Sequence, residues 1–149
     1  MKKQMKKQIR DFVLLVVVVF LLNLIWEYFH FSLYYDLTGI PKHQHLWLAT
    51  LTDALIIGAV FLFISLFHKS IEWIKKPRKA DYSVIIFSCL IIAISIETHA
   101  LLTGKWAYKE IMPTLFGIGI SPLFQLATTS LVGLEIFRRI KKTKIKKVR

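Results

Sequence analysis

Four long apolar stretches, separated by short polar segments, dominate the sequence. They cover residues 12–35, 46–67, 83–102 and 112–137. Each is close to or above the roughly 20 residues that a helix needs to cross a bilayer, and none alternates with the period of two typical of a barrel strand. The pattern predicts an all-α integral membrane protein, a single membrane domain over residues 1–149, built as an up-down bundle of four transmembrane helices.

The fourth stretch contains residue types that disturb a helix. Pro122 lies inside it, and Gly117 and Gly119 come just before that proline. A proline within a helix removes a backbone hydrogen bond and bends the axis. Irregular backbone persists in a membrane only where it lines protein or a wet cavity. We therefore expect the fourth helix to be kinked or broken near Pro122.

The basic residues predict how the chain is oriented. Of the 21 Lys and Arg, five precede the first stretch, five lie between the second and third, and eight follow the fourth. Such clusters mark cytoplasmic segments, so both termini and the middle loop are expected in the cytoplasm, at the plasma membrane of a prokaryote. Trp73, in the middle loop, is expected to rest on the membrane interface. Although the net charge is +12, this arrangement favours anionic lipid headgroups as partners, and we expect no nucleic acid.

Three of the nine acidic residues lie where a membrane helix should be apolar. Glu27, Asp53 and Glu97 fall inside the first, second and third stretches, where a carboxylate costs about 2.5–3.5 kcal/mol. At about 1.5 Å per residue, Glu27 and Glu97 lie about 22 and 21 Å from the inner boundary, and Asp53 about 10 Å below the outer one. In a core about 30 Å thick these depths nearly coincide. The sequence predicts one acidic site that faces the bundle interior and opens outward.

Other polar residues share helix faces with these acids. Asn23, Glu27 and His30 follow the spacing i, i+4, i+7, which places them on one face. Gln125 belongs to a similar stripe on the fourth helix, together with Ser121 and Thr128. We expect these faces to contribute to the acidic site.

Glu97 and His99 cannot both face that site. They are two residues apart, which is about 200° around a helix. One of them is expected in the site and the other at a neighbouring helix or at the membrane interface.

The order of these residues resembles a known family. The chain reads Trp26-Glu27-Tyr28, then Asp53, Glu97, Trp106-x-Tyr108-x-x-x-Met112-Pro113 and Ser121-Pro122-x-x-Gln125. This pattern resembles a family of small, uncharacterised, four-span prokaryotic membrane proteins. It differs at Thr52, where relatives have glycine before the aspartate. The resemblance implies the four-span fold and singles out the same residues, but it implies no activity.

The first functional hypothesis is an enzyme that acts on a lipid or isoprenoid by proton transfer. Carboxylates in a dry pocket can exchange protons with a substrate, and aromatic faces can hold a developing cation. The candidate catalytic residues are Glu27, Asp53, Glu97 and His99. The candidate substrate-binding residues are Trp26, Asn23, Trp106, Tyr108 and Gln125.

Three alternatives stay open at this point, so the sequence does not decide whether the chain is an enzyme. Glu27, His30, Asp53 and Glu97 could hold one divalent metal ion such as Zn²⁺, Mn²⁺ or Fe²⁺. Acids within a membrane also mark transport and proton-relay paths, which a homo-oligomer could complete. The chain could also be an accessory membrane subunit whose acids pair with a partner's cations.

Overall fold

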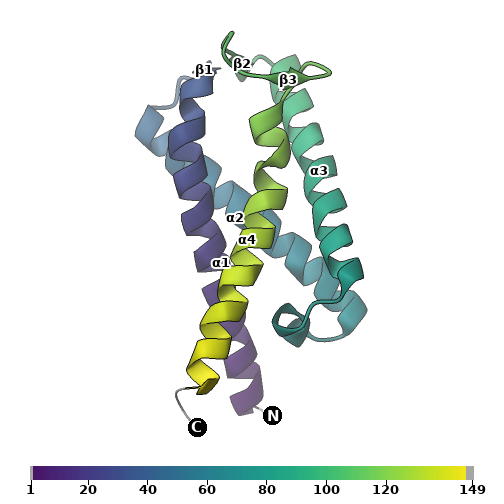
Figure 1. Ribbon diagram of the computed structural model, residues 1–149. Helices are drawn as coiled ribbons and strands as arrows, with labels where there is room; N and C mark the ends of the chain where they lie inside the picture. The colour runs from purple at the N-terminus through teal and green to yellow at the C-terminus, as the bar shows by residue number, and fades with distance from the viewer. Residues whose placement is uncertain (1, 147–149) are drawn as a thin grey trace.

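The computed structural model describes residues 2–146, with side chains for residues 4–143. Its four long helices are α1 (Lys2–His30), α2 (Lys42–His68), α3 (Lys79–Leu102) and α4 (Ile120–Lys146). All four are long and apolar enough to cross a membrane. They pack into one bundle, with α4 between α1 and α3 in the view of Figure 1. This is the all-α four-helix arrangement that the hydropathy pattern predicts.

The two ends of the bundle differ in what caps them. Both chain termini lie at one end, here called the terminal end (Figure 1). The other, here called the strand end, carries short strands that the hydropathy pattern did not predict. There β1 (Tyr34–Asp36), which follows the turn η1 (Phe31–Leu33), pairs antiparallel with β2 (Trp106–Tyr108). A second pair joins β3 (Thr114–Leu115) to β4 (Ile118–Gly119).

The predicted start of the fourth helix, at residue 112, is wrong. The segment before α4 forms the β3–β4 turn, with positive φ at Phe116 and Gly117, and α4 begins only at Ile120. Pro122 is therefore the third residue of its helix. A proline in the first turn is tolerated because its missing N–H would have no partner inside the helix. The expected kink near Pro122 is not confirmed.

The first helix also differs from its predicted bounds. The first helix was predicted over residues 12–35, but α1 begins at Lys2 and ends at His30. Its polar N-terminal residues continue the helix below the apolar stretch, and the aromatic residues after His30 form η1 and β1. Hydropathy marks the length of the apolar segment, whereas backbone hydrogen bonding decides where the helix ends.

The segment between α2 and α3 folds inward. The short turn η2 (Ile71–Lys75) buries Trp73, and Ile74 is fully buried. The Trp73 indole donates a hydrogen bond to Ser65 Oγ at 2.8 Å and its ring packs against Phe61. The expectation that Trp73 rests on the membrane interface is wrong, because its indole closes the apolar core at the terminal end.

Close packing of α1 against α4 completes this core. A Cβ atom placed on Gly133 would lie 2.7 Å from Val19 Cγ2, so glycine is what lets the two helices approach there. Beyond this contact, apolar side chains from all four helices are fully buried: Leu15, Ile57, Phe61, Ile85, Leu134 and Phe137.

Candidate active site

Two of the predicted acids meet on a single amide nitrogen. Gln125 Nε2, on α4, lies 2.6 Å from Glu27 Oε1 on α1 and 2.7 Å from Asp53 Oδ2 on α2. The two carboxylate oxygens can thus be no farther apart than the sum of these distances. Three helices position one compact acid pair, here called the Glu27–Asp53 pair.

Asn23 lies one turn before Glu27 on α1 and is part of the same hydrogen-bonded group. It is fully buried, its Nδ2 donates to the Val19 carbonyl, and its Oδ1 accepts from Thr129 Oγ1 at 3.2 Å and lies 3.3 Å from Gln125 Nε2. An amide nitrogen carries only two hydrogens. Because Gln125 Nε2 faces three acceptors, it cannot satisfy all of them at once, and the acid pair keeps lone pairs free for a proton or a ligand.

The pair opens into a cavity of about 350 Å³ that reaches the strand end. Glu27, Asp53 and Glu97 all line it, so the three predicted carboxylates share one cavity. Its wall between them is formed mainly by apolar side chains, including Leu48, Ala93 and Leu126. A cavity of this size can hold a small molecule or one end of a larger ligand.

Glu97 has a different environment from the acid pair. It accepts hydrogen bonds from Tyr108 Oη at 2.6 Å, Trp106 Nε1 at 3.2 Å and Tyr34 Oη at 3.4 Å. Burial, together with the neighbouring Glu97 carboxylate, raises the pKa of both tyrosine hydroxyls above their usual range. Both tyrosines therefore stay protonated and keep donating. Through these hydrogen bonds Glu97 holds β1 and β2 in place at the strand end of the cavity.

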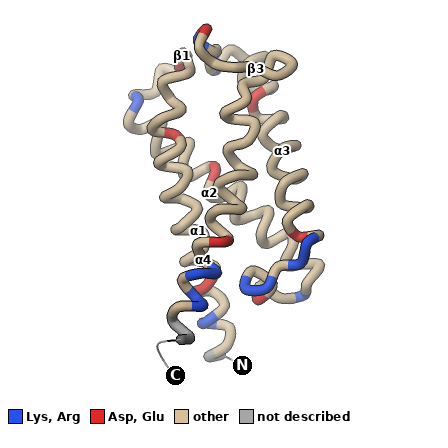
Figure 2. The backbone as a smooth tube through the Cα atoms, viewed as in Figure 1, with Lys and Arg blue, Asp and Glu red and all other residues tan. Residues whose placement is uncertain are grey.

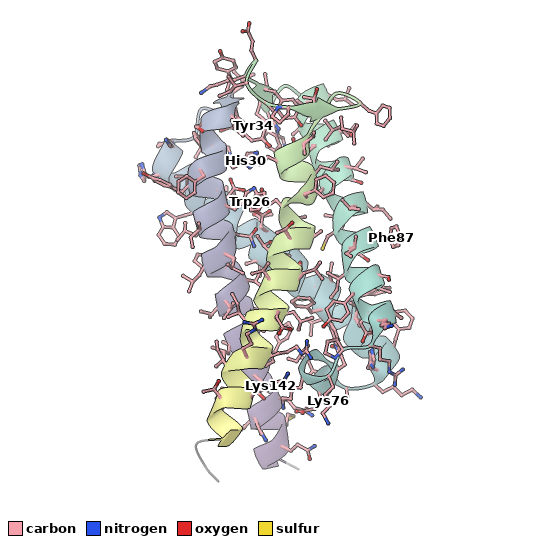
Figure 3. The ribbon with its side chains drawn as sticks, viewed as in Figure 1. Trp26, His30, Tyr34, Lys76, Phe87 and Lys142 are labelled. Atoms are coloured by element: carbon pink, nitrogen blue, oxygen red, sulfur yellow. The ribbon has the colours of Figure 1, made fainter. Side chains whose placement is uncertain are left out.

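The ring nitrogens of His30 and Trp26 are buried without hydrogen-bond partners among the described residues. The His30 side chain is only 5% exposed, and neither of its ring nitrogens has a hydrogen-bond partner among the described residues. The same holds for Trp26 Nε1. His30 lines the acid cavity, whereas Trp26 lines a separate groove between α1 and α4. Figure 3 shows both residues on α1, followed by Tyr34 toward the strand end.

His99 does not join the site. Its side chain is exposed and does not line the cavity, while Glu97 is buried and does. Of this predicted pair, Glu97 faces inward, because the two point to nearly opposite sides of α3. The structure therefore does not bring His99 into the cavity with the other candidate catalytic residues.

The cavity mouth carries charge of both signs. Asp36 Oδ2 lies 2.6 Å from His45 Nδ1, Asp36 Oδ1 accepts from Thr38, and Lys105 also lines the cavity. Burial raises the pKa of Asp36, but the hydrogen bonds from Thr38 and the contact with His45 outweigh it, so the pKa lies below its usual value. Asp36 is therefore a structural carboxylate, distinct from the acids deeper in the cavity.

The proposed metal ligands do not form a metal-binding group. Within the part of the chain that the structure describes, no three His, Cys, Asp or Glu side chains gather closely enough to hold an ion. Glu27 and Asp53 both contact Gln125, whereas Glu97 accepts hydrogen bonds from three donors.

Tyr34 and Thr129 contact predicted site residues but were not themselves expected from the sequence. Tyr34 was placed in the first helix, but it reaches Glu97 because the helix ends early and β1 pairs with β2. Thr129 donates to Asn23. It lies four residues after Gln125, and that spacing could have identified it, whereas the neighbouring Thr128 of the predicted stripe is exposed.

Comparison with known proteins leaves the family open. No family model matches the chain, and neither a curated protein nor a solved structure does. The resemblance to small four-span prokaryotic membrane proteins therefore stays a prediction.

Proposed function

We propose that this chain is a multi-pass protein of a prokaryotic plasma membrane, with its terminal end in the cytoplasm. The proposal is supported by four helices of sufficient length and apolarity and by the concentration of Lys and Arg toward the terminal end in Figure 2. Basic segments stay on the cytoplasmic side, where they would also bind anionic headgroups. In this orientation the acid cavity lies in the outer half of the membrane and opens outward.

Its activity, in this proposal, is proton transfer to and from a lipid-derived substrate, most simply the movement of a double bond. The observation that carries it is the contact of Glu27 and Asp53 with one Gln125 nitrogen inside a largely apolar cavity. Two carboxylates this close favour a state in which they share one proton. Such a pair holds an acid and a base side by side.

The roles follow from the contacts. The protonated member of the pair adds its proton to one carbon of a double bond, and the ionised member removes a proton from a nearby carbon. The double bond moves, and no oxidant or reductant is needed. Gln125 is a positioning residue, since it fixes the distance between the two acids. Glu97, already bound by three donors, holds the strands that close the cavity rather than exchanging protons.

The test is deuterium incorporation. Purified protein would be reconstituted into vesicles made from the total lipid extract of the membranes that produced it. After incubation in D₂O, the lipids would be compared by high-resolution mass spectrometry. We expect deuterium at carbon in one lipid class with the wild type, and a loss of at least about 100-fold in Glu27→Gln and Asp53→Asn, because general acid–base catalysis contributes about 10²–10⁴-fold.

Glu135→Gln is the matched control. Glu135 is half-exposed on α4 and pairs with Arg138 and Arg139. It does not line the cavity, so deuterium incorporation should be unchanged. Folded wild type that labels no lipid, or labelling that persists in both acid variants, would overturn the proposal.

A further inference from the structure

A second hollow lies beside the acid cavity, between α1 and α4. This groove, here called the α1–α4 groove, has a volume of about 480 Å³. It shares one lining residue with the acid cavity, His30. Its rim includes Ile25, Phe29 and Val132, which are exposed apolar side chains on the outside of the bundle. In a membrane these side chains would face lipid, so the groove would open sideways into the bilayer.

The groove contains polar groups that lack partners. Trp26 Nε1 is a hydrogen-bond donor only, and it is buried without an acceptor among the described residues. The His30 ring, at the boundary between the groove and the acid cavity, also lacks one at either nitrogen. Buried polar groups are normally satisfied, and an exception calls for a missing partner. An oxygen atom of a ligand would supply an acceptor for Trp26.

The lining also limits the charge of such a ligand. Apart from His30, the described lining residues are apolar, aromatic or hydroxyl-bearing, with neither Lys nor Arg among them. A phosphate headgroup buried there would have no cation to compensate it. The chemistry favours an uncharged lipid with an apolar chain and a single hydroxyl or carbonyl oxygen.

We propose that the α1–α4 groove binds the chain of a neutral, oxygen-bearing lipid, such as a long-chain alcohol or ketone, and presents it past His30 to the acid cavity. The inference rests on the proposed function, for which it names the substrate class. The oxygen accepts a hydrogen bond from Trp26 Nε1 and the chain covers Ile25 and Val132. His30 is the polar wall that the reacting end of the lipid passes.

The test is photo-crosslinking in vesicles with a long-chain alcohol that carries a diazirine, followed by mapping of the labelled peptides. Wild type should be labelled in the α1–α4 groove, and an excess of the unmodified alcohol should remove that labelling. The diazirine-bearing alkyl phosphate of equal chain length should not label the groove. Trp26→Phe keeps most of the ring but loses the donor, so the alcohol concentration for half-maximal labelling should rise about fivefold, as expected for one lost hydrogen bond.

Filling the groove provides the second variant. Val132→Trp adds bulk at its half-exposed rim and should remove groove labelling, whereas Ile91→Trp adds bulk on the exposed face of α3 and should not. Equal labelling in Val132→Trp and wild type, labelling spread over all four helices, or equal labelling by the phosphate would overturn the inference. Glu27→Gln separates the two proposals, because it should stop deuterium transfer and leave groove labelling intact. Groove labelling without deuterium transfer in the wild type would overturn only the proposed function.

Discussion

Buried acids have different partners in the two halves of the bundle. In the terminal half, Asp11 is 1% exposed and has two cations beside it, Lys75 at 2.9 Å and Lys141. In the strand half, Glu27 and Asp53 share one neutral amide nitrogen, and no Lys or Arg within the described chain forms an ion pair with either. A compensated charge serves structure, whereas an uncompensated pair costs stability and is typical of a functional site.

The largest effect should come from the compensated acid. Replacing Asp11 by Asn removes the carboxylate that pairs with Lys141 and leaves Lys75 paired only with Glu72. Removing one partner of a buried ion pair is strongly destabilising, so the free energy of unfolding should fall by about 3 kcal/mol. Titration with a denaturing detergent in mixed micelles would measure it.

Glu135→Gln is the control for that loss. Glu135 also pairs with two cations, but its side chain is 43% exposed, and exposed pairs contribute less than about 1 kcal/mol. Equal losses in the two variants would mean that burial does not distinguish these carboxylates, and the contrast between the halves would fail.

A smaller loss of stability should follow from adding bulk at the contact between Gly133 and Val19. Gly133→Ala would bring a methyl group within 2.7 Å of the stiff, β-branched Val19, and such overpacking costs about 1–3 kcal/mol. Gly58→Ala, between α1 and α2, meets its nearest side-chain atom at an ordinary 3.6 Å and should be tolerated. The same detergent titration compares them, and a greater loss in Gly58→Ala would contradict the packing described for α1 and α4.

Substitution of one of the uncompensated acids should change stability in the opposite direction, as a gain. Glu27→Gln removes one of two adjacent carboxylates and adds an amide that can donate to Asp53, so stability should rise by about 1 kcal/mol while deuterium transfer is lost. Asn23→Ala is the contrasting variant, because it removes a fully buried side chain that links α1 to Thr129 and Gln125 of α4 and leaves a cavity there, so it should destabilise. A loss of stability in Glu27→Gln as large as that in Asp11→Asn would show that the acid pair is structural.

The sequence identifies the acid layer because carboxylates in apolar helices are rare and helix rise converts their positions into depth. Glu27, Asp53, Asn23 and Gln125 were therefore expected together, and they lie together. The partners of Glu97 were only partly predictable. Tyr34 reaches it through the pairing of β1 with β2, which joins segments far apart in the chain, and two three-residue strands have no hydrophobic period to detect.

The ends of the helices, and which of their residues point toward the bundle interior, were predicted less well. Met112–Gly119 is apolar enough to extend a helix, but glycine at positive φ and the Ile120 N–H bond to the Pro113 carbonyl make it a turn. His99 shows why the inward-pointing residues were hard to predict. It is as polar as Glu97, so only the packing of α3 decides which of them is buried.

The smallest effect should appear at the cavity mouth, as a dependence on pH. The pKa of Asp36 is lowered in the folded protein by its hydrogen bonds with Thr38 and its contact with His45. A lowered pKa stabilises the fold above the unfolded value of 3.8, and this contribution is lost as pH falls through the folded value. Asp36→Asn should therefore destabilise β1 slightly at about pH 6, and this loss should shrink as the pH falls below the unfolded value of 3.8. Hydrogen exchange at the Leu37 amide, which donates to the Lys105 carbonyl, would report the difference, and an effect that grows on acidification would show that Asp36 belongs with the uncompensated acids of the cavity.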